Sequence, residues 1–131
     1  MRLLILAKAL LKFLVFIVPL LIGFLFQLPS FKGWFGEKMV ALKARFSLPK
    51  DDYAAFHNVT LPDGEGTTQI DHIFVSRFGI FVIETKNMKG WIFGNASRPN
   101  WTQSIFRKKC QFQNPIRQNF KHIKTLEDLL D

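Results

Sequence analysis

Hydrophobic positions divide the chain into a long uncharged run and a region where short apolar segments alternate with polar ones. No charged residue occurs from Phe13 to Phe31. At about 1.5 Å per residue, this run just reaches across the roughly 30 Å hydrocarbon core of a bilayer. The pattern predicts a single transmembrane helix, so residues 1–31 are expected to form an N-terminal membrane anchor.

Two other interpretations of the apolar run remain open. A cleaved signal peptide fits the basic start, but no small-residue cleavage site follows the run. A buried core helix rarely needs so long an uncharged segment. The orientation is almost undetermined, because lysines and arginines lie both before the run and soon after it.

The remaining residues, 32–131, have the pattern of a small domain. Apolar residues at helical spacing, Phe35, Met39, Leu42 and Phe46, predict a helix with one buried stripe, ended by Pro49. A strand is predicted near Tyr53–Leu61, and the following "PDGEG" is typical of a turn. The stretch "TTQIDHIFVSRFGIFVIETKN", residues 67–87, then predicts two strands joined by a tight turn.

The last third of the chain predicts one short strand, a loop and a helix. Trp91–Phe93 is the strand, bracketed by glycines, and "NASRPN" is the loop. In the helix, Asn114 suits the N-cap and Pro115 the first position. Its buried stripe is expected to consist of Ile116, Phe120, Ile123 and Leu126 or Leu130. The order of helix, three or four strands and helix predicts an α/β (α+β) fold with helices flanking a sheet.

The charge and the cysteine content of the chain limit the kinds of partner that it is expected to bind. Of the formal charge of +8, Arg2, Lys8 and Lys12 carry three, which leaves +5 on residues 32–131. Such a surplus suits a polyanion or an anionic membrane surface, although an ordinary basic surface has the same charge. The single cysteine, Cys110, excludes an intrachain disulfide and belongs to no zinc-binding cluster.

Three ionisable residues interrupt the apolar hairpin. Glu84 and Lys86 are two apart, so on a strand they point to the same face. A turn centred on Arg77 and Phe78 sets Asp71 opposite Glu84, with Cβ atoms roughly 4.5–5.5 Å apart. Two carboxylates at that distance repel each other, and either a shared proton or a divalent cation would relieve the repulsion. A plain salt bridge with the lysine is the alternative, and a one-residue bulge would turn Asp71 to the other face.

Several short motifs resemble the nuclease-related domain (NERD) family. They are Gly36-Glu37, "TTQIDHIFVS", "GIFVIETKN", "GWIFG", Trp101-Thr102-Gln103 and "NPIRQNFKHIKTL", in family order across residues 36 to about 130. NERD domains are placed in the PD-(D/E)xK restriction-endonuclease-like superfamily. The resemblance implies a mixed sheet flanked by helices, and the chain ends where a closing strand would be expected.

The resemblance also implies roles for individual residues. Asp71 and the Glu84-Thr85-Lys86 segment match the superfamily's acidic and E-x-K motifs, and Glu37 occupies the place of a further glutamate on the first helix. Asp71, Glu84 and Glu37 are thus expected to bind Mg²⁺ or Mn²⁺, with Lys86 catalytic beside them. Gln118 and His122, four apart on the last helix, are possible substrate-binding residues.

Aromatic and basic residues outside this motif allow two interpretations. Trp91 and Trp101 could stack on a base, but packing in the core is favoured. Five cations either flank a nucleic-acid backbone or are scattered solvated charge: Lys89, Arg98, Arg107, Lys108 and Lys109.

The sequence therefore predicts a membrane-anchored, metal-dependent nuclease that hydrolyses DNA phosphodiester bonds. A single-pass protein with its domain on the cytoplasmic side is expected, because DNA and Mg²⁺ are found there. The rival is a catalytically inactive module on the same fold, tethered to the membrane and binding nucleic acid or a partner.

Overall fold

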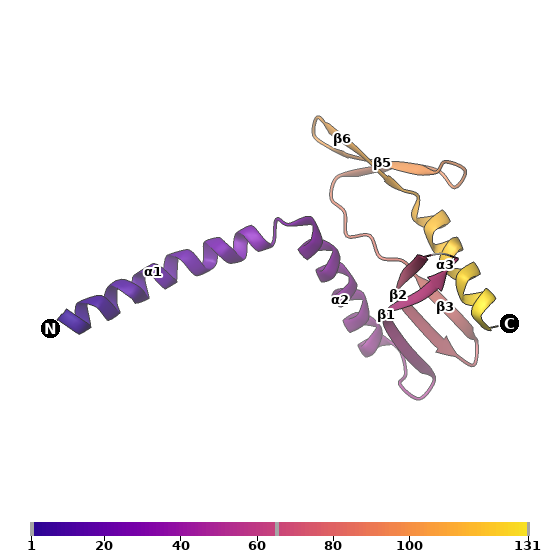
Figure 1. Ribbon diagram of the computed structural model, residues 1–131, viewed down its shortest axis with the longest axis horizontal. Helices are drawn as coiled ribbons and strands as arrows, with labels where there is room; N and C mark the ends of the chain where they lie inside the picture. Colours follow the sequence, from indigo (N-terminus) through magenta and orange to yellow (C-terminus); the bar gives the residue numbers. More distant parts are fainter. Residues whose placement is uncertain (1, 65, 131) are drawn as a thin grey trace. The chain divides into compact units, whose positions relative to one another are not determined.

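The structure, a computed structural model, describes residues 2–64 and 66–130, except for the side chains of residues 2–7 and 9. Contacts divide it into two compact units, Met1–Phe35 and Gly36–Asp131. The elements are helices α1 (Arg2–Leu25), α2 (Pro29–Ser47) and α3 (Pro115–Leu130), and strands β1 (Tyr53–Asp63), β2 (Gly66–Ser76), β3 (Gly79–Ile83), β4 (Trp91–Phe93), β5 (Asn100–Ile105) and β6 (Lys108–Gln113) (Figure 1).

The apolar run of the N-terminal unit is broken rather than continuous. Helix α1 ends at Leu25, and residues 26–28 form a turn before α2 begins at Pro29. Proline lacks the backbone N–H that a continuing helix would donate, and it disfavours helical geometry at the preceding Leu28. Proline is well suited to the first position of a new helix. The prediction of one helix through Phe31 is therefore wrong at its C-terminal end.

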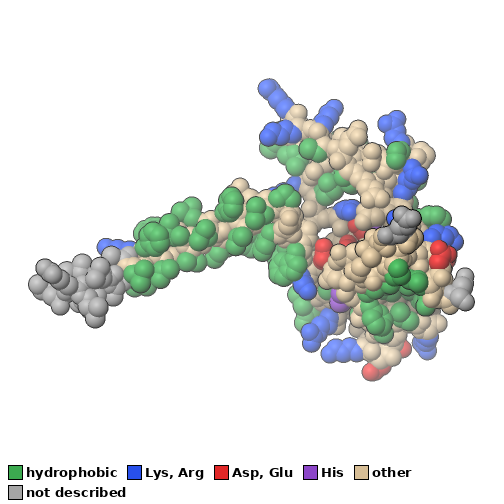
Figure 2. Space-filling view, in the orientation of Figure 1, with side chains coloured by type: hydrophobic (Ala, Val, Ile, Leu, Met, Phe, Trp, Pro, Cys, Tyr) green, Lys and Arg blue, Asp and Glu red, His purple; other side chains and the backbone are tan. Residues whose placement is uncertain are grey.

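Aromatic rings pack around this break. Phe26 meets Phe31 edge-on with ring centroids 4.8 Å apart, and Phe31 lies 5.6 Å from the ring of Trp34. The side chains from Leu10 to Leu25 are otherwise mostly exposed and apolar, and Figure 2 shows them along α1.

No single helix among the described residues is long and apolar enough to cross a membrane. The segment Leu10–Leu25 and helix α2 reach that length and composition together, as a bent pair.

The first sheet has the order β1-β2-β3 and is antiparallel throughout. The predicted register of the β2–β3 hairpin is confirmed, since Ile73 pairs with Val82 and Ser76 with Gly79 around the turn at Arg77 and Phe78. The Ser76 hydroxyl donates to the Gly79 carbonyl and accepts from the Phe78 N–H. Strand β1 continues to Asp63, so the first two residues of the predicted "PDGEG" turn are strand, and Glu65 lies outside the described residues.

Both ladders are interrupted beside Asp71. The β2–β3 pairing ends at His72 with Ile83, one position before the expected pair of Asp71 with Glu84. On the other side of β2, the pairing with β1 runs through His57 with His72 and resumes at Val59 with Ile70. It skips Asn58, whose backbone has a left-handed φ of 54°. Asp71 is thus the point on β2 where the sheet is irregular on both sides, as is common near functional residues.

The second sheet has the order β4-β5-β6 and is also antiparallel. Two glycines allow β4 to approach β5 closely. A Cβ on Gly90 would lie 2.4 Å from the Ser104 carbonyl oxygen, and one on Gly94 would lie 2.2 Å from the Trp101 ring. The "GWIFG" motif is therefore a short strand flanked by two glycines, at positions where a side chain would clash with β5.

This sheet corrects the sequence-based fold in two respects. The structure contains two small antiparallel sheets in place of one mixed sheet, and the β5–β6 hairpin was not anticipated. Its turn consists of Phe106 and Arg107, and Phe106 adopts a φ of 52°. Residues with positive φ in tight hairpins are usually glycine or asparagine, so the sequence "FR" does not signal a turn.

Asn114 connects the second sheet to helix α3, as predicted for an N-cap. Its Oδ1 accepts from the Ile116 N–H at 2.9 Å, and its Nδ2 donates to the carbonyls of Asn95, Ala96 and Arg98. The side chain is fully buried. One residue therefore both starts the helix and holds the 95–98 loop.

The predicted buried stripe is wrong for α2 and holds only in part for α3, where Ile123 and Leu126 are half-buried. On α2, Met39, Leu42 and Phe46 are exposed, and on α3 so are Ile116 and Phe120. The residues that turn inward are Gly36, Glu37 and Val40 on α2, and His122 and Thr125 on α3. The apolar spacing is helical in both segments, but the residues that turn inward include glycine and polar residues beside smaller or half-buried apolar ones.

Candidate active site

Glu84 lies in the segment that follows β3, and its carboxylate is almost fully buried. Only 5% of its side chain is exposed. Lys86 Nζ binds Oε1 at 2.6 Å, and His122 Nε2 binds Oε2 at 3.2 Å. A buried carboxylate requires such partners, because an unpaired buried charge is strongly destabilising. Two cationic or donor groups thus fix both oxygens of Glu84.

Lys86 links Glu84 to helix α3. Its ammonium also donates to Gln118 Oε1 at 2.9 Å, and its side chain is about one-third exposed. Sequence analysis expected Glu84 and Lys86 on the same face of a strand. Their side chains do meet, although β3 ends at Ile83 and both residues belong to the connection after it.

His122 joins Glu84 to strand β2. The ring is buried, and its Nδ1 lies 3.1 Å from the Thr68 hydroxyl. An ionised carboxylate can only accept, so Nε2 must carry the proton that is shared with Glu84. Sequence analysis suggested His122 and Gln118 as substrate-binding residues. In the structure Gln118 contacts Lys86 and His122 contacts Glu84, and both side chains also line a polar cavity.

Asp71 approaches the same segment from β2. Its Oδ2 accepts a hydrogen bond of 2.7 Å from the Thr85 N–H. This bond takes the place of the ladder that ends one residue earlier, and it ties Asp71 to the residue between Glu84 and Lys86. The expected strand pair of Asp71 with Glu84 is absent, but the two acidic residues still come from adjoining segments.

Glu37 reaches the site because Gly36 precedes it on α2. Gly36 is buried, and a Cβ there would lie 2.6 Å from Cβ of Asn87. A larger residue would therefore push α2 away from the segment that carries Glu84. The Gly36-Glu37 motif is visible in the sequence, but the reason for its glycine is visible only in the structure.

Burial and neighbouring negative charge raise the pKa of Glu37 above its usual value. Burial is the largest cause, and the carboxylates of Asp71 and then Glu84 add to it. Three acidic residues from α2, β2 and the segment after β3 therefore affect one another electrostatically. Their mutual repulsion favours anything that neutralises charge at this place, either a proton or a cation.

Glu37→Gln is expected to raise the thermal midpoint slightly at neutral pH without added metal. Because the folded-state pKa of Glu37 is raised, its ionisation costs folding free energy as pH rises through the carboxylate range. Below about pH 4 the residue is protonated in both states, so the advantage disappears. Thermal unfolding in EDTA across pH checks this expectation. A variant that is less stable than the wild type at neutral pH would contradict it.

A polar cavity of about 370 Å³ adjoins these residues. Its lining includes Glu37, Thr67, Thr68, Gln69, Asp71, Gln113, Gln118, Lys121 and His122. The cavity therefore connects α2, β2, the end of β6 and α3. Its lining offers carboxylate, amide, hydroxyl and ammonium groups, which suit a hydrated cation and a phosphate more than an apolar ligand.

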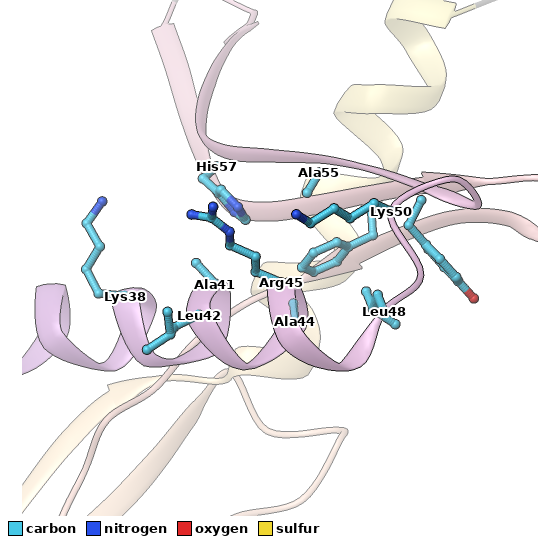
Figure 3. A pocket seen from close by; sticks show the side chains of 11 residues that line it. Lys38, Ala41, Leu42, Ala44, Arg45, Leu48, Lys50, Ala55 and His57 are labelled. Atoms are coloured by element: carbon cyan, nitrogen blue, oxygen red, sulfur yellow. The ribbon is translucent and has the colours of Figure 1, made fainter.

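A second cavity, of about 390 Å³, lies between α2 and the first sheet and has a different character. Its charged lining residues are all basic, with Lys38, Arg45 and Lys50 beside His57 (Figure 3). The rest of the lining is mainly apolar and includes Ala41, Leu42 and Phe74. The two acidic side chains Glu37 and Asp71 line the first cavity and not the second, and the first cavity is also lined by Gln118 and His122, which the sequence had indicated.

The protein is thus of the class of small α/β domains that carry a buried glutamate paired with a lysine and two further acidic residues. Comparison with known families identifies it further. The chain belongs to the nuclease-related domain (NERD) family, whose model matches residues 32–131. The PD-(D/E)xK superfamily is the general context of this family, so the resemblance found in the sequence is confirmed.

Among curated proteins, an uncharacterized protein of Bacillus anthracis is 50% identical over 106 residues. The match covers 80% of this chain, and the chain spans about half the length of that relative. No solved structure matches the chain. Family membership thus indicates a nuclease-related function, and divalent metal use is suggested for such domains in general.

The acidic residues fit a divalent cation in chemistry but do not form a complete cage. Within the described part of the chain, no three histidine, cysteine, aspartate or glutamate side chains are grouped closely enough to hold a metal ion. Mg²⁺ is usually bound by one or two carboxylates, with waters and substrate phosphates as further ligands. Asp71 and Glu84 suit that mode. A cation on Glu84 has to share its oxygens with Lys86 and His122.

Proposed function

We propose that this protein hydrolyses phosphodiester bonds of DNA with the help of Mg²⁺ or Mn²⁺. The observation that carries the proposal is that Asp71 is bonded to the segment that carries the Glu84–Lys86 pair, beside a polar cavity that Asp71 and Glu37 line. The carboxylates of Asp71 and Glu84 both act electrostatically on Glu37. Family membership supports the same class of chemistry.

Asp71 and Glu84 would hold the cation, with Glu37 as an additional ligand. When bound, a divalent cation polarises a phosphoryl oxygen and lowers the pKa of a bound water. The protein's own contribution is to hold the two carboxylates in place. Thr85 N–H restrains Asp71, and His122, itself bonded to Thr68, restrains Glu84.

Lys86 would act on the attacking water and on the phosphate. Its ammonium is partly exposed and is held between Glu84 and Gln118, so it can reach solvent without losing every partner. Lysine offers a compact positive charge on a flexible stem, which suits stabilisation of charge that develops on a phosphoryl oxygen. Gln118 would keep the ammonium at the cavity.

The test is cleavage of plasmid and linear DNA by the full chain in EDTA, Mg²⁺ and Mn²⁺. Cleavage that requires either metal supports the proposal. An inactive protein that binds DNA equally well with and without metal would favour the rival, a binding module on the same fold. One structural observation favours that rival, because both oxygens of Glu84 are already bound by side chains.

We further propose that residues 13–31 anchor the protein in a membrane, with the domain on the cytoplasmic side. The absence of charged residues from Phe13 to Phe31 and the exposure of the apolar side chains of α1 support this anchor. The protein is then expected to remain in the membrane fraction after a carbonate wash. Its release into the supernatant would contradict the anchor and leave the hydrolysis proposal intact.

A further inference from the structure

Strand β4 exposes two aromatic rings on one face of the second sheet. Trp91 and Phe93 are two residues apart, so they point to the same side, and Ile92 points to the other. Their exposed fractions are 75% for Trp91 and 57% for Phe93. Sequence analysis favoured Trp91 as a core residue, and the structure contradicts that prediction. Two large exposed rings on one face form an apolar patch of the kind that binding sites present.

The register of the sheet shows which polar residues share this face. Trp91 pairs with Ser104, which in turn pairs with Lys109 on β6. Because paired residues point to the same side, Lys109 belongs to the face of Trp91 and Phe93. Alternation along β6 adds Gln111 and Gln113. We call Trp91, Phe93, Lys109, Gln111 and Gln113 the aromatic face.

The aromatic face continues to the candidate active site. Gln113, at the end of β6, also lines the polar cavity that contains Glu37 and Asp71. From Lys109 to Gln113 the strand covers about 13 Å. A ligand that crosses this face from β4 to the Gln113 end of β6 would therefore run from the aromatic rings to the cavity that Glu37 and Asp71 line.

The charge around the face selects a polyanion. No acidic residue occurs in the sequence between Glu84 and Glu127, an interval that contains the whole second sheet. Basic side chains gather over β5 and β6 in Figure 2, where Arg107 lies in the hairpin turn and Lys108 and Lys109 follow it. Exposed rings, cations and amide side chains together are the combination that proteins use for unpaired nucleic-acid strands, whose bases stack on aromatic side chains.

We propose that the aromatic face binds single-stranded DNA, with Trp91 and Phe93 stacking on bases and Lys109 contacting phosphate. Duplex bases are already stacked on one another and do not offer their faces to these rings. This inference rests on the proposed hydrolysis, since it names an unpaired strand as the form of DNA that would be led to Asp71 and Glu84. The binding itself does not require cleavage.

The test measures binding of the full chain to a labelled oligothymidylate of about 15 nucleotides, with EDTA present to prevent hydrolysis. Trp91→Ala and Phe93→Ala are each expected to weaken binding roughly tenfold. Ile92→Ala, on the opposite side of the same strand, is the matched control and should bind like the wild type. Trp91→Phe should restore most of the binding, which separates stacking from loss of fold.

A second matched pair tests the phosphate contact. Lys109→Ala is expected to reduce the slope of log affinity against log salt by about 0.7, the value for one phosphate contact on a single strand. Lys108→Ala carries the same charge change on the opposite side of β6 and should leave the slope nearly unchanged. Equal effects of the two variants would contradict a directional face.

Two outcomes would overturn the inference. One is unchanged oligothymidylate binding by Trp91→Ala and Phe93→Ala. The other is that these variants lose binding to phosphatidylglycerol vesicles but keep binding to oligothymidylate, which would make the face a membrane contact. Because the measurement is made in EDTA, its result is independent of whether the protein cleaves DNA. If the wild-type protein binds the oligothymidylate but does not cleave DNA with metal present, that result would instead count against the proposed hydrolysis.

Discussion

Asp71→Asn and Glu84→Gln are each expected to lower the rate of metal-dependent DNA cleavage by roughly 100-fold or more. Each change keeps the size of the side chain and removes one negative charge. Asp71→Asn can keep an acceptor for the Thr85 N–H, and Glu84→Gln can keep one acceptor for His122 or Lys86. The loss should thus reflect the missing charge more than a missing contact.

Glu127→Gln is the control for these two substitutions. Glu127 is an exposed glutamate of α3 that pairs with Lys124, away from the residues that line the polar cavity. Its replacement removes the same charge and should leave the cleavage rate near that of the wild type. Rates are compared at saturating Mg²⁺ after confirming that all three variants unfold at similar temperatures. Cleavage that survives both Asp71→Asn and Glu84→Gln would show that the reaction takes place elsewhere.

Asn114→Ala is expected to cause the largest loss of stability among simple polar substitutions. The change removes the N-cap of α3 and leaves the carbonyls of the 95–98 loop without the amide donor that they share. A lost cap costs about 1 kcal/mol, and buried groups left unsatisfied cost about 1–3 kcal/mol more. For a domain of this size the thermal midpoint should fall by about 10 °C or more.

Asn114→Ser separates the two roles of this residue. Serine retains an acceptor that can cap the helix, but it cannot donate to the three loop carbonyls. Its thermal midpoint should therefore lie between those of Asn114→Ala and the wild type. A midpoint for Asn114→Ala within two or three degrees of the wild type would refute the idea that this asparagine holds the loop and the helix together.

Local signals in the sequence were sufficient for several elements. The alternation of residues 67–87 predicted the β2–β3 hairpin with its register, because one register alone matches the turn and the apolar positions. Asn114 followed by Pro115 predicted the start of α3, since both residue types have a physical preference for these positions. The glycines around Trp91–Phe93 marked β4 for a similar reason.

Features that depend on tertiary contacts could not be read in the same way. The inward faces of α2 and α3 carry Gly36 and His122, because close approach and hydrogen bonding to the segment after β3 decide them. Apolar spacing pointed to Met39 and Phe120, which are exposed. The interruption of β1 at Asn58 likewise has no signal in composition.

The candidate site contains residues that the sequence indicates and residues that only tertiary contacts reveal. Asp71, Glu84 and Lys86 could be selected because charges inside an apolar hairpin are unusual, whatever their exact pairing. The roles of His122 and Thr68 could not, because their contacts join residues 54 positions apart in the chain. The aromatic face also required the structure, since only the register of β4, β5 and β6 places Lys109 on the side of Trp91.

The most direct test of the central claim is a crystal structure of the protein grown with Mn²⁺, with anomalous diffraction used to locate the metal. We expect an anomalous peak about 2.0–2.2 Å from carboxylate oxygens of Asp71 and Glu84, with Glu37 adjacent. The peak should be absent from crystals of Asp71→Asn. A Mn²⁺ peak elsewhere, or none at these carboxylates when the metal is in excess, would contradict the assignment of this site.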